Sequence, residues 1–363
     1  VDDIITTGAS GLNSKRLFGT SARVCIWILV VWGVFIAVRS ATEQLNNQQA
    51  FLIQKAEVLE RMADEETAGP EVERLRMLAD GLRRQGRDYW KADWRYLLLA
   101  GVLYGISLLP AAKYWWDCLI ALGQNVPMRT AIWAYLYGNL GKYFPGKAMV
   151  IVLRLASLAP LGVRRVATTL TIFIETLTMM AVGGAVAAVC LLLLNVDWRL
   201  SVLAVVVVIC MLVPTFPPLL RYLLIRLQPG VEQAELQLWA RRLSWKLILR
   251  GWGTLGLTWL GFGLSLGCVL YSLPTAEFSA ASPVQFWLST LGACALAVVL
   301  GFLSLIPGGA GVREVVLTLV LAPVVGPAAA LSCAIWLRIT WLVVQLLLAA
   351  GFYFFRFPVT TVR

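Results

Sequence analysis

The sequence predicts an all-α polytopic membrane protein with about six full transmembrane helices, two re-entrant broken-helix hairpins and an inverted pseudo-repeat. Of its 363 residues, 59% are hydrophobic and 14% are charged, and the mean hydropathy is +0.77. Several apolar runs reach the roughly 20 residues that a helix needs to cross a bilayer. Backbone groups in lipid must bond internally and barrel-like alternation is absent, so these runs are expected to be helices.

The composition excludes several classes of site. The chain contains no His, which removes His-based acid–base chemistry and most zinc or di-iron sites. Its seven Cys are scattered, mostly in apolar runs, without a CxxC pair, and are expected to be core residues. We therefore expect no metal, no cofactor and no catalytic residue. The net charge of +11 would suit nucleic acid, but cytoplasmic loops and anionic lipid explain it more simply, so no nucleic-acid partner is expected.

The N-terminal quarter of the chain divides into three parts. Residues 1–23 form a polar leader, and 24–40 form a first span without a small-residue cleavage site after it. Residues 41–94 are a charged insert in which apolar residues recur at helical spacing on both sides of a break at 68–70. This pattern predicts a helical hairpin outside the membrane. It could dock a partner, although a solvated hairpin packed on itself is the simpler interpretation.

The remaining transmembrane domain, 95–356, combines full spans with two broken stretches. The apolar stretch at residues 130–158 is interrupted around Pro145. Each of the two half-helices that remain is too short to cross the membrane, so this stretch predicts a re-entrant hairpin. Residues 286–325 repeat the pattern with a break at 306–314. Residues 357–363 form a short tail. The full spans are expected at about 95–113, 166–194, 200–224, 247–271 and 328–355.

The charge of the loops predicts the orientation of the chain. Residues 142–165 carry five Lys or Arg and no acid, and residues 221–250 carry six Lys or Arg against two Glu. The loops around 197 and 277 are nearly uncharged. The positive-inside rule therefore places both termini and the basic loops in the cytoplasm, as a multi-pass protein of the cell membrane. The first hairpin then enters from the cytoplasm, and the second enters from outside.

The two halves of the chain carry corresponding charges deep in the membrane. Pro145 precedes Glu175 by 30 residues, and Pro307 precedes Arg338 by 31. Both charged residues fall roughly 14–15 Å into their spans, near the midplane, from opposite sides. Corresponding broken helices in two oppositely oriented halves indicate a transporter with a binding site at the midplane.

The chemistry of this predicted site leaves two interpretations open. A charge at the bilayer centre costs at least about 2.5–3.5 kcal/mol, so Glu175 and Arg338 could simply pair with each other, or with Glu314 or Arg313. Alternatively, they line a polar cavity. Half-helices that begin after Pro-Gly breaks direct free N–H groups into the break, and the second break resembles a glycine-rich phosphate cradle. Close helix packing by small residues is the competing explanation.

The candidate lipid-binding residues follow from this hypothesis. Cations in the first turn of each half-helix oppose its dipole unless an anion lies between them, and phosphate is the obvious anion. The candidates are Pro145, Gly146, Lys147, Arg154, Glu175, Pro307, Gly308, Gly309, Arg313, Glu314 and Arg338.

Four motifs resemble the transmembrane flippase region of lysylphosphatidylglycerol synthases. They are GNLGKYFPGK…LR…LG (138–162), IET (174–176), IPGGAGVRE (306–314) and WLRITW (336–341), and the resemblance covers roughly 95–355. It implies a flippase-like domain that moves an anionic, aminoacylated, polyprenyl or glycosylated lipid between leaflets. No segment resembles the soluble aminoacyltransferase domain, so lysyl transfer is not implied. The insert at 41–94 is larger than the usual loop of the family.

Two other classes of function compete with lipid transport. The chain could be a non-transporting scaffold or accessory subunit of an envelope-lipid pathway. An integral membrane glycosyl- or phosphotransferase would need clustered carboxylates near one face, whereas Asp117 and Asp197 are solitary. We therefore expect a protein that is not an enzyme. Its expected partners are membrane lipids that bear phosphate; a biosynthetic enzyme of envelope lipids is a candidate partner, and self-association stays open.

Overall fold

The computed structural model describes most of the transmembrane domain and much of the insert. The described residues are 39, 43, 46, 47, 49–65, 69–88, 91–143, 148–194, 198–219, 221, 222, 233–276, 282–304, 306, 309 and 311–354. Their regular structure is helical throughout, without strands. The predicted leader, almost all of the predicted span at 24–40 and the predicted tail lie outside the described residues.

Five helices of the described residues are long and apolar enough to cross a membrane. They confirm the prediction of an all-helical membrane protein, and four of them coincide with predicted spans. The five helices are α3 (Trp94–Ala121), α6 (Arg165–Leu193), α10 (Trp245–Tyr271), α11 (Pro283–Leu303) and α13 (Pro327–Phe354).

One predicted span and one predicted hairpin arm differ from the described helices. The predicted span at 200–224 is α7 (Trp198–Leu212), only 15 residues long, followed by the 3-10 turn η3 (Val213–Thr215). Pro214 cannot donate a backbone hydrogen bond, and two further prolines follow within four residues, which explains the early end. By contrast, α11 lies where the first arm of a re-entrant hairpin was predicted, yet its 21 residues extend roughly 31 Å. Six full spans are therefore not reproduced within the described residues.

The first broken stretch forms two short helices that lie side by side. These are α4 (Met128–Gly138), which continues into the 3-10 helix η1 (Asn139–Tyr143), and α5 (Ala148–Leu158), followed by η2 (Ala159–Leu161). Gly141 allows the close approach, because a Cβ atom there would lie 2.3 Å from the backbone nitrogen of Val150. In the second broken stretch, α12 (Val312–Val325) packs against α11 and α13.

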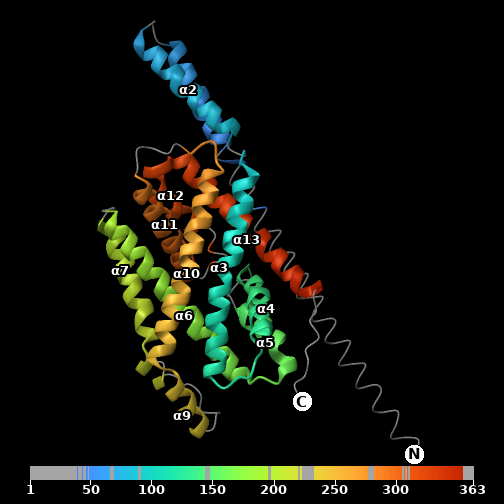
Figure 1. The fold of residues 1–363 in the computed structure, drawn as a ribbon. Helices are drawn as coiled ribbons and strands as arrows, with labels where there is room; N and C mark the ends of the chain where they lie inside the picture. Colours follow the sequence, from blue (N-terminus) through green and yellow to red (C-terminus); the bar gives the residue numbers. More distant parts are fainter. Residues whose placement is uncertain are drawn as a thin grey trace, which may run out of the picture.

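The two central helices, α3 and α10, are antiparallel, and this defines two ends of the bundle. At one end, the amide of Asp93 donates to the carbonyl of Ser272 over 2.8 Å. At the other end, Arg250 lies 4.0 Å from Asp117. The loops of the α4–α5 pair lie at the Asp117 end, where the amide of Arg164 donates to Gln124 over 2.9 Å. Figure 1 shows α12 toward the opposite end, so the two helix pairs open to opposite ends.

The insert forms two helical segments that lie side by side beyond the Asp93 end of the bundle (Figure 1). Residues 49–65 run alongside α2 (Pro70–Asp88). Ion pairs join the two segments, with 2.6 Å between Arg83 and Glu60 and 3.2 Å between Arg76 and Asp64. Leu52 packs in a small cluster with Ile335 of α13, which ties the base of the insert to the bundle.

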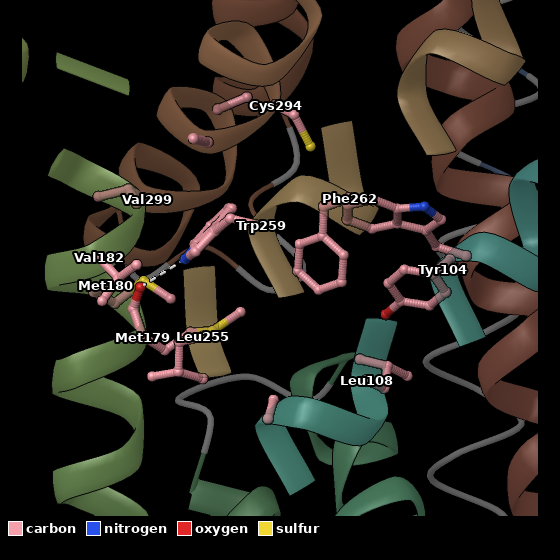
Figure 2. Packing of buried hydrophobic residues seen from close by; sticks show 14 of the residues in the cluster. Tyr104, Leu108, Met179, Met180, Val182, Leu255, Trp259, Phe262, Cys294 and Val299 are labelled. Carbon is pink, nitrogen blue, oxygen red and sulfur yellow. Dashed lines mark hydrogen bonds between the residues drawn. The ribbon is translucent and has the colours of Figure 1, made fainter. Parts of the chain in front are cut away.

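A core of aromatic side chains holds the long helices together (Figure 2). The fully buried Trp259 of α10 donates its indole N–H to the carbonyl of Met179 on α6 over 3.0 Å. Its ring covers Gly183, where an added Cβ atom would lie 2.2 Å from a ring carbon. On the α3 side, Tyr104 stacks on Trp341 with 4.4 Å between ring centroids. These contacts fix the relative positions of α3, α6, α10 and α13.

Helix α7 and the short helix α9 (Gln233–Arg242) complete the described bundle. Helix α7 packs along α6, on the side away from α4 and α5 (Figure 1). Helix α9 lies at the Asp117 end, where a Cβ atom on Gly123 would lie 3.4 Å from the guanidinium of Arg242. The α3–α4 turn and the basic end of α9 therefore lie together at this end of the molecule.

Candidate functional site

The first buried ion pair joins α5 to α6. Nη1 of Arg154 donates to Oε2 of Glu175 over 3.0 Å, and the two side chains are only 2% and 4% exposed. The hydroxyl of Tyr135 on α4 donates to the other carboxylate oxygen over 3.1 Å. Both oxygens of Glu175 are therefore satisfied, as a buried carboxylate requires.

Aromatic rings and one glycine position Arg154 for this pair. Its guanidinium carbon lies 4.1 Å from the ring centre of Tyr135 and 4.8 Å from that of Trp115. The indole N–H of Trp115 is fixed by a 3.1 Å hydrogen bond to Thr171. A Cβ atom on Gly138 would lie 2.4 Å from the Arg154 side chain, so only glycine leaves room for the arginine stem. The cation is thus held by a carboxylate and by two π faces.

The second buried ion pair joins α12 to α13. Nη1 of Arg338 donates to Oε1 of Glu314 over 3.1 Å, and the side chains are 14% and 6% exposed. Within the described part of the chain, Nε of Arg338 and Oε2 of Glu314 have no hydrogen-bond partner. A cavity of about 20 Å³ adjoins the pair and is also lined by Arg313 and Trp341. Its volume suffices for about one water molecule.

Two cations near these pairs have no acidic partner among the described residues. The stem of Arg313, on α12, lies across Gly301 and Gly309, where a Cβ atom at either glycine would lie 2.9 Å from its Nε. No carboxylate of the described residues lies within the 4.0 Å of an ion pair from Arg313 or from Lys142 of η1. Both side chains are partly buried.

The helix η1 lies between the two ion pairs. It packs against α13, and Lys142 lies within electrostatic range of both Arg154 and Glu175. The neighbouring Tyr143 lies within range of Arg313 and Arg338. Residues from α5, α6, α12 and α13 therefore surround the short segment at which α4 ends.

The structure separates the predicted site residues into two groups. Glu175 and Arg338 do not pair with each other; each pairs within its own half of the chain, Glu175 with Arg154 and Arg338 with Glu314. The small cavity adjoins the second pair and Arg313. Gly309 is buried with a φ of +67°, a backbone conformation that favours glycine. Pro145, Gly146, Lys147, Pro307 and Gly308 lie outside the described residues, between helices that end at Tyr143 and Leu303 and resume at Ala148 and Val312.

Sequence reasoning missed three residues of the site. Tyr135 and Trp115 lie in apolar stretches, where an aromatic residue usually signals core packing or lipid anchoring. Lys142 was used only to orient the chain, although it lies in the same GKYFPGK segment as Lys147. Its position three residues before the Pro-Gly break was the one signal that could have identified it.

A protein-family model matches most of the chain. Residues 80–349 match the family model described as the lysylphosphatidylglycerol synthase TM region. The chain belongs to this family. The match includes both ion pairs, η1 and all five candidate spans apart from the last residues of α13. Membership of the lysylphosphatidylglycerol synthase TM family connects this membrane protein to lipid metabolism or transport. No individual curated protein matches the chain.

Proposed function

We propose that this protein is a lipid flippase, which moves a lipid with a phosphate-bearing headgroup between leaflets past η1. The observation that supports the proposal is the pair of buried Arg–Glu contacts on either side of this short segment. Isolated charges in hydrocarbon are costly, and pairing leaves a polar path whose own charges are neutralised. The lipid is anionic, aminoacylated, or carries a polyprenyl or glycosyl group.

The contacts between helices support an inverted repeat as the basis of this activity. In the proposed repeat, α3, α4–α5 and α6 correspond to α10, α11–α12 and α13. The contacts of the third helix of each half then correspond: α6 packs on α10 and α11, just as α13 packs on α3 and α4. The order of charges is exchanged, because α5 and α6 carry Arg and Glu whereas α12 and α13 carry Glu and Arg.

The same correspondence suggests how the repeats lie in the membrane. We place the Asp117 end in the cytoplasm of the cell membrane, together with both termini, and the insert outside. In this arrangement α4, η1 and α5 form a re-entrant hairpin from the cytoplasm, and α12 returns to the outer side after the full-length α11. A single cysteine at position 60 should then react with an impermeant reagent from outside only; reaction from inside would contradict this orientation.

An enzymatic role has less support from the described residues. A glycosyl- or phosphotransferase needs clustered carboxylates, but Asp117 is held by Lys113 over 2.7 Å and faces Arg250 at 4.0 Å. Asp197 lies outside the described residues. The proposal therefore includes no catalytic residue and no cofactor. Within a scaffold or accessory subunit, which is the second candidate, the ion pairs would serve only to stabilise the bundle.

Leaflet exchange in proteoliposomes tests the proposal. Phosphatidylglycerol labelled on one acyl chain is reconstituted with the protein, and the outer label is quenched by an impermeant reductant. The wild-type protein should expose nearly all of the label to the quencher. The Lys246→Gln variant, which removes an exposed cation at the Asp117 end, should behave like the wild type. If the wild-type protein leaves half of the label protected, as protein-free vesicles do, a scaffold is favoured and the flippase proposal fails.

A further inference from the structure

We infer that Lys113 and Arg250, on either side of the buried carboxylate of Asp117, bind the phosphate of an anionic lipid at the lipid-facing surface of the bundle. The site lies between α3 and α10, which run side by side (Figure 1). It is separate from the path past η1, so it stands whether or not the protein moves lipids between leaflets. Three observations support it: an excess of positive charge, the depth of the two cations and the apolar surface beside them.

A glycine on α10 brings the two helices close enough for these side chains to meet. A Cβ atom on Gly251 would lie 2.4 Å from the ring of Tyr114 on α3, so a larger residue would push the helices apart. Lys113 directly precedes Tyr114 in the chain, and Arg250 directly precedes Gly251. The close contact therefore places the two cations at the same level of the bundle.

Asp117 is shared by both cations. Nζ of Lys113 donates to Oδ2 of Asp117 over 2.7 Å. Nη1 of Arg250 lies 4.0 Å from Oδ1, which is too long for a hydrogen bond. The Arg250 side chain is 62% exposed, so its donors are accessible from outside the bundle. Among the described side chains, no other carboxylate lies within ion-pair distance of either cation, which leaves one positive charge in excess.

The two cations lie at about the depth of the lipid headgroups. Helix α3 has 28 residues and is about 42 Å long, whereas the hydrocarbon core is about 30 Å thick, so α3 extends beyond the core. Arg250 lies in the second turn of α10, and Lys113 lies about two turns before the end of α3. Nζ of Lys113 is also 5.9 Å from the ring centre of Trp116, a residue type enriched at this boundary. Lipid phosphates occupy the same level.

Exposed apolar side chains continue from the two cations toward the middle of both helices. On α10 they follow Arg250 at helical spacing, and on α3 they precede Lys113 in the same way. They are Leu257, Leu260 and Leu264 on α10, and Ile106 and Leu109 on α3. A lipid whose phosphate bonds to Arg250 can therefore lay its acyl chains along this surface.

Phosphate is the anion that these donors fit. A guanidinium presents N–H groups in a rigid fork that matches two phosphate oxygens, and an ammonium group adds a compact charge. The phosphodiester of an anionic lipid carries one negative charge, which would neutralise the excess at Lys113 and Arg250. A zwitterionic lipid brings its own cation with its phosphate and neutralises the excess less well. The site should therefore favour anionic over zwitterionic lipids.

Native mass spectrometry of the full chain in detergent tests this site without measuring transport. Phosphatidylglycerol or phosphatidylcholine is titrated into the wild-type protein, Arg250→Gln, Lys113→Gln and the control Arg165→Gln, which removes an exposed cation from the start of α6 at the same end. The wild type should retain one more phosphatidylglycerol than Arg250→Gln or Lys113→Gln, whose affinity for that lipid should fall at least about fivefold. The control should match the wild type, and phosphatidylcholine should not distinguish the four proteins.

Two further measurements separate lipid binding from a structural role. Arg250→Gln should keep the wild-type unfolding temperature, because its side chain is mostly exposed and forms no hydrogen bond with Asp117. Asp117→Asn should bind phosphatidylglycerol more tightly, because it removes the charge that competes with the phosphate for Lys113. If Arg250→Gln unfolds at a lower temperature and retains as much lipid as the wild type, the three residues only stabilise the bundle.

Three other results would overturn the inference. Equal retention of the two lipids by the wild type would show that the site does not read charge. A loss in Arg165→Gln as large as that in Arg250→Gln would assign binding to the overall charge of this end. Release of the retained lipid by millimolar inorganic phosphate would assign the cations to a soluble phosphate. None of these results bears on the flippase proposal, because leaflet exchange is not measured.

Discussion

Neutralising Glu175 tests whether the buried pair between α5 and α6 is as desolvated as its geometry indicates. In Glu175→Gln, the guanidinium of Arg154 stays 2% exposed but loses its counter-charge at 3.0 Å. Removal of one partner of a buried pair typically costs about 3–5 kcal/mol. The rings of Tyr135 and Trp115, at 4.1 and 4.8 Å, retain part of the stabilisation, since a desolvated cation–π contact contributes roughly 2 kcal/mol. We therefore expect a loss of about 1–3 kcal/mol.

Reversible unfolding in detergent, followed by circular dichroism, measures this change for Glu175→Gln, Arg154→Gln and the double variant. The double variant should recover most of the stability, because neither charge is then left without a partner. The matched control is Glu60→Gln, whose partner Arg83 lies at 2.6 Å but whose side chains are 33% and 42% exposed. An exposed pair contributes about 0–1 kcal/mol. A loss at Glu175 no larger than that at Glu60 would refute the argument from burial.

Two glycine substitutions probe the packing that positions the pair and the core. Gly138→Ala places a Cβ atom 2.4 Å from the Arg154 stem and should cost about 1–3 kcal/mol, whereas Gly253→Ala, with nothing within 4 Å, should cost nothing in the same unfolding assay. Gly183→Ala places a Cβ atom 2.2 Å from the ring of Trp259 and should lower the unfolding temperature. An unchanged unfolding temperature would show that the ring does not cover α6.

Hydropathy alone predicted the all-helical membrane character, because long apolar helices carry their signal in one contiguous segment. The lengths of individual helices were less well predicted, although local signals existed. Pro214 and the prolines after it mark the end of α7. The capping box of Ser282 with Gln285 marks the start of α11. Counted from this start, the apolar run of α11 is long enough to cross the membrane as a single helix.

The sequence offered Glu314 among the alternative partners for the deep charges, and it pairs with Arg338, but the pairing of Glu175 with Arg154 was not predicted. Spacing placed Glu175 and Arg338 at similar depths, but depth does not distinguish among partners on different helices. The choice of Arg154 for Glu175 depends on how closely α4, α5 and α6 pack, and therefore on Gly138 and Gly141. The role of Tyr135 depends on the same packing, because its hydroxyl reaches Glu175 only in the folded bundle.

The most direct test of lipid movement past these pairs is leaflet exchange by the Arg154→Gln/Glu175→Gln double variant. This variant removes both charges, and its expected recovery of stability separates transport from folding. Labelled phosphatidylglycerol and reductant quenching give the exchange rate at equal protein density, with the wild type and Lys246→Gln as references. The flippase account predicts a rate at least tenfold below that of the wild type in a variant of near wild-type stability. Exchange at the wild-type rate would contradict it and leave the pair with a structural role alone.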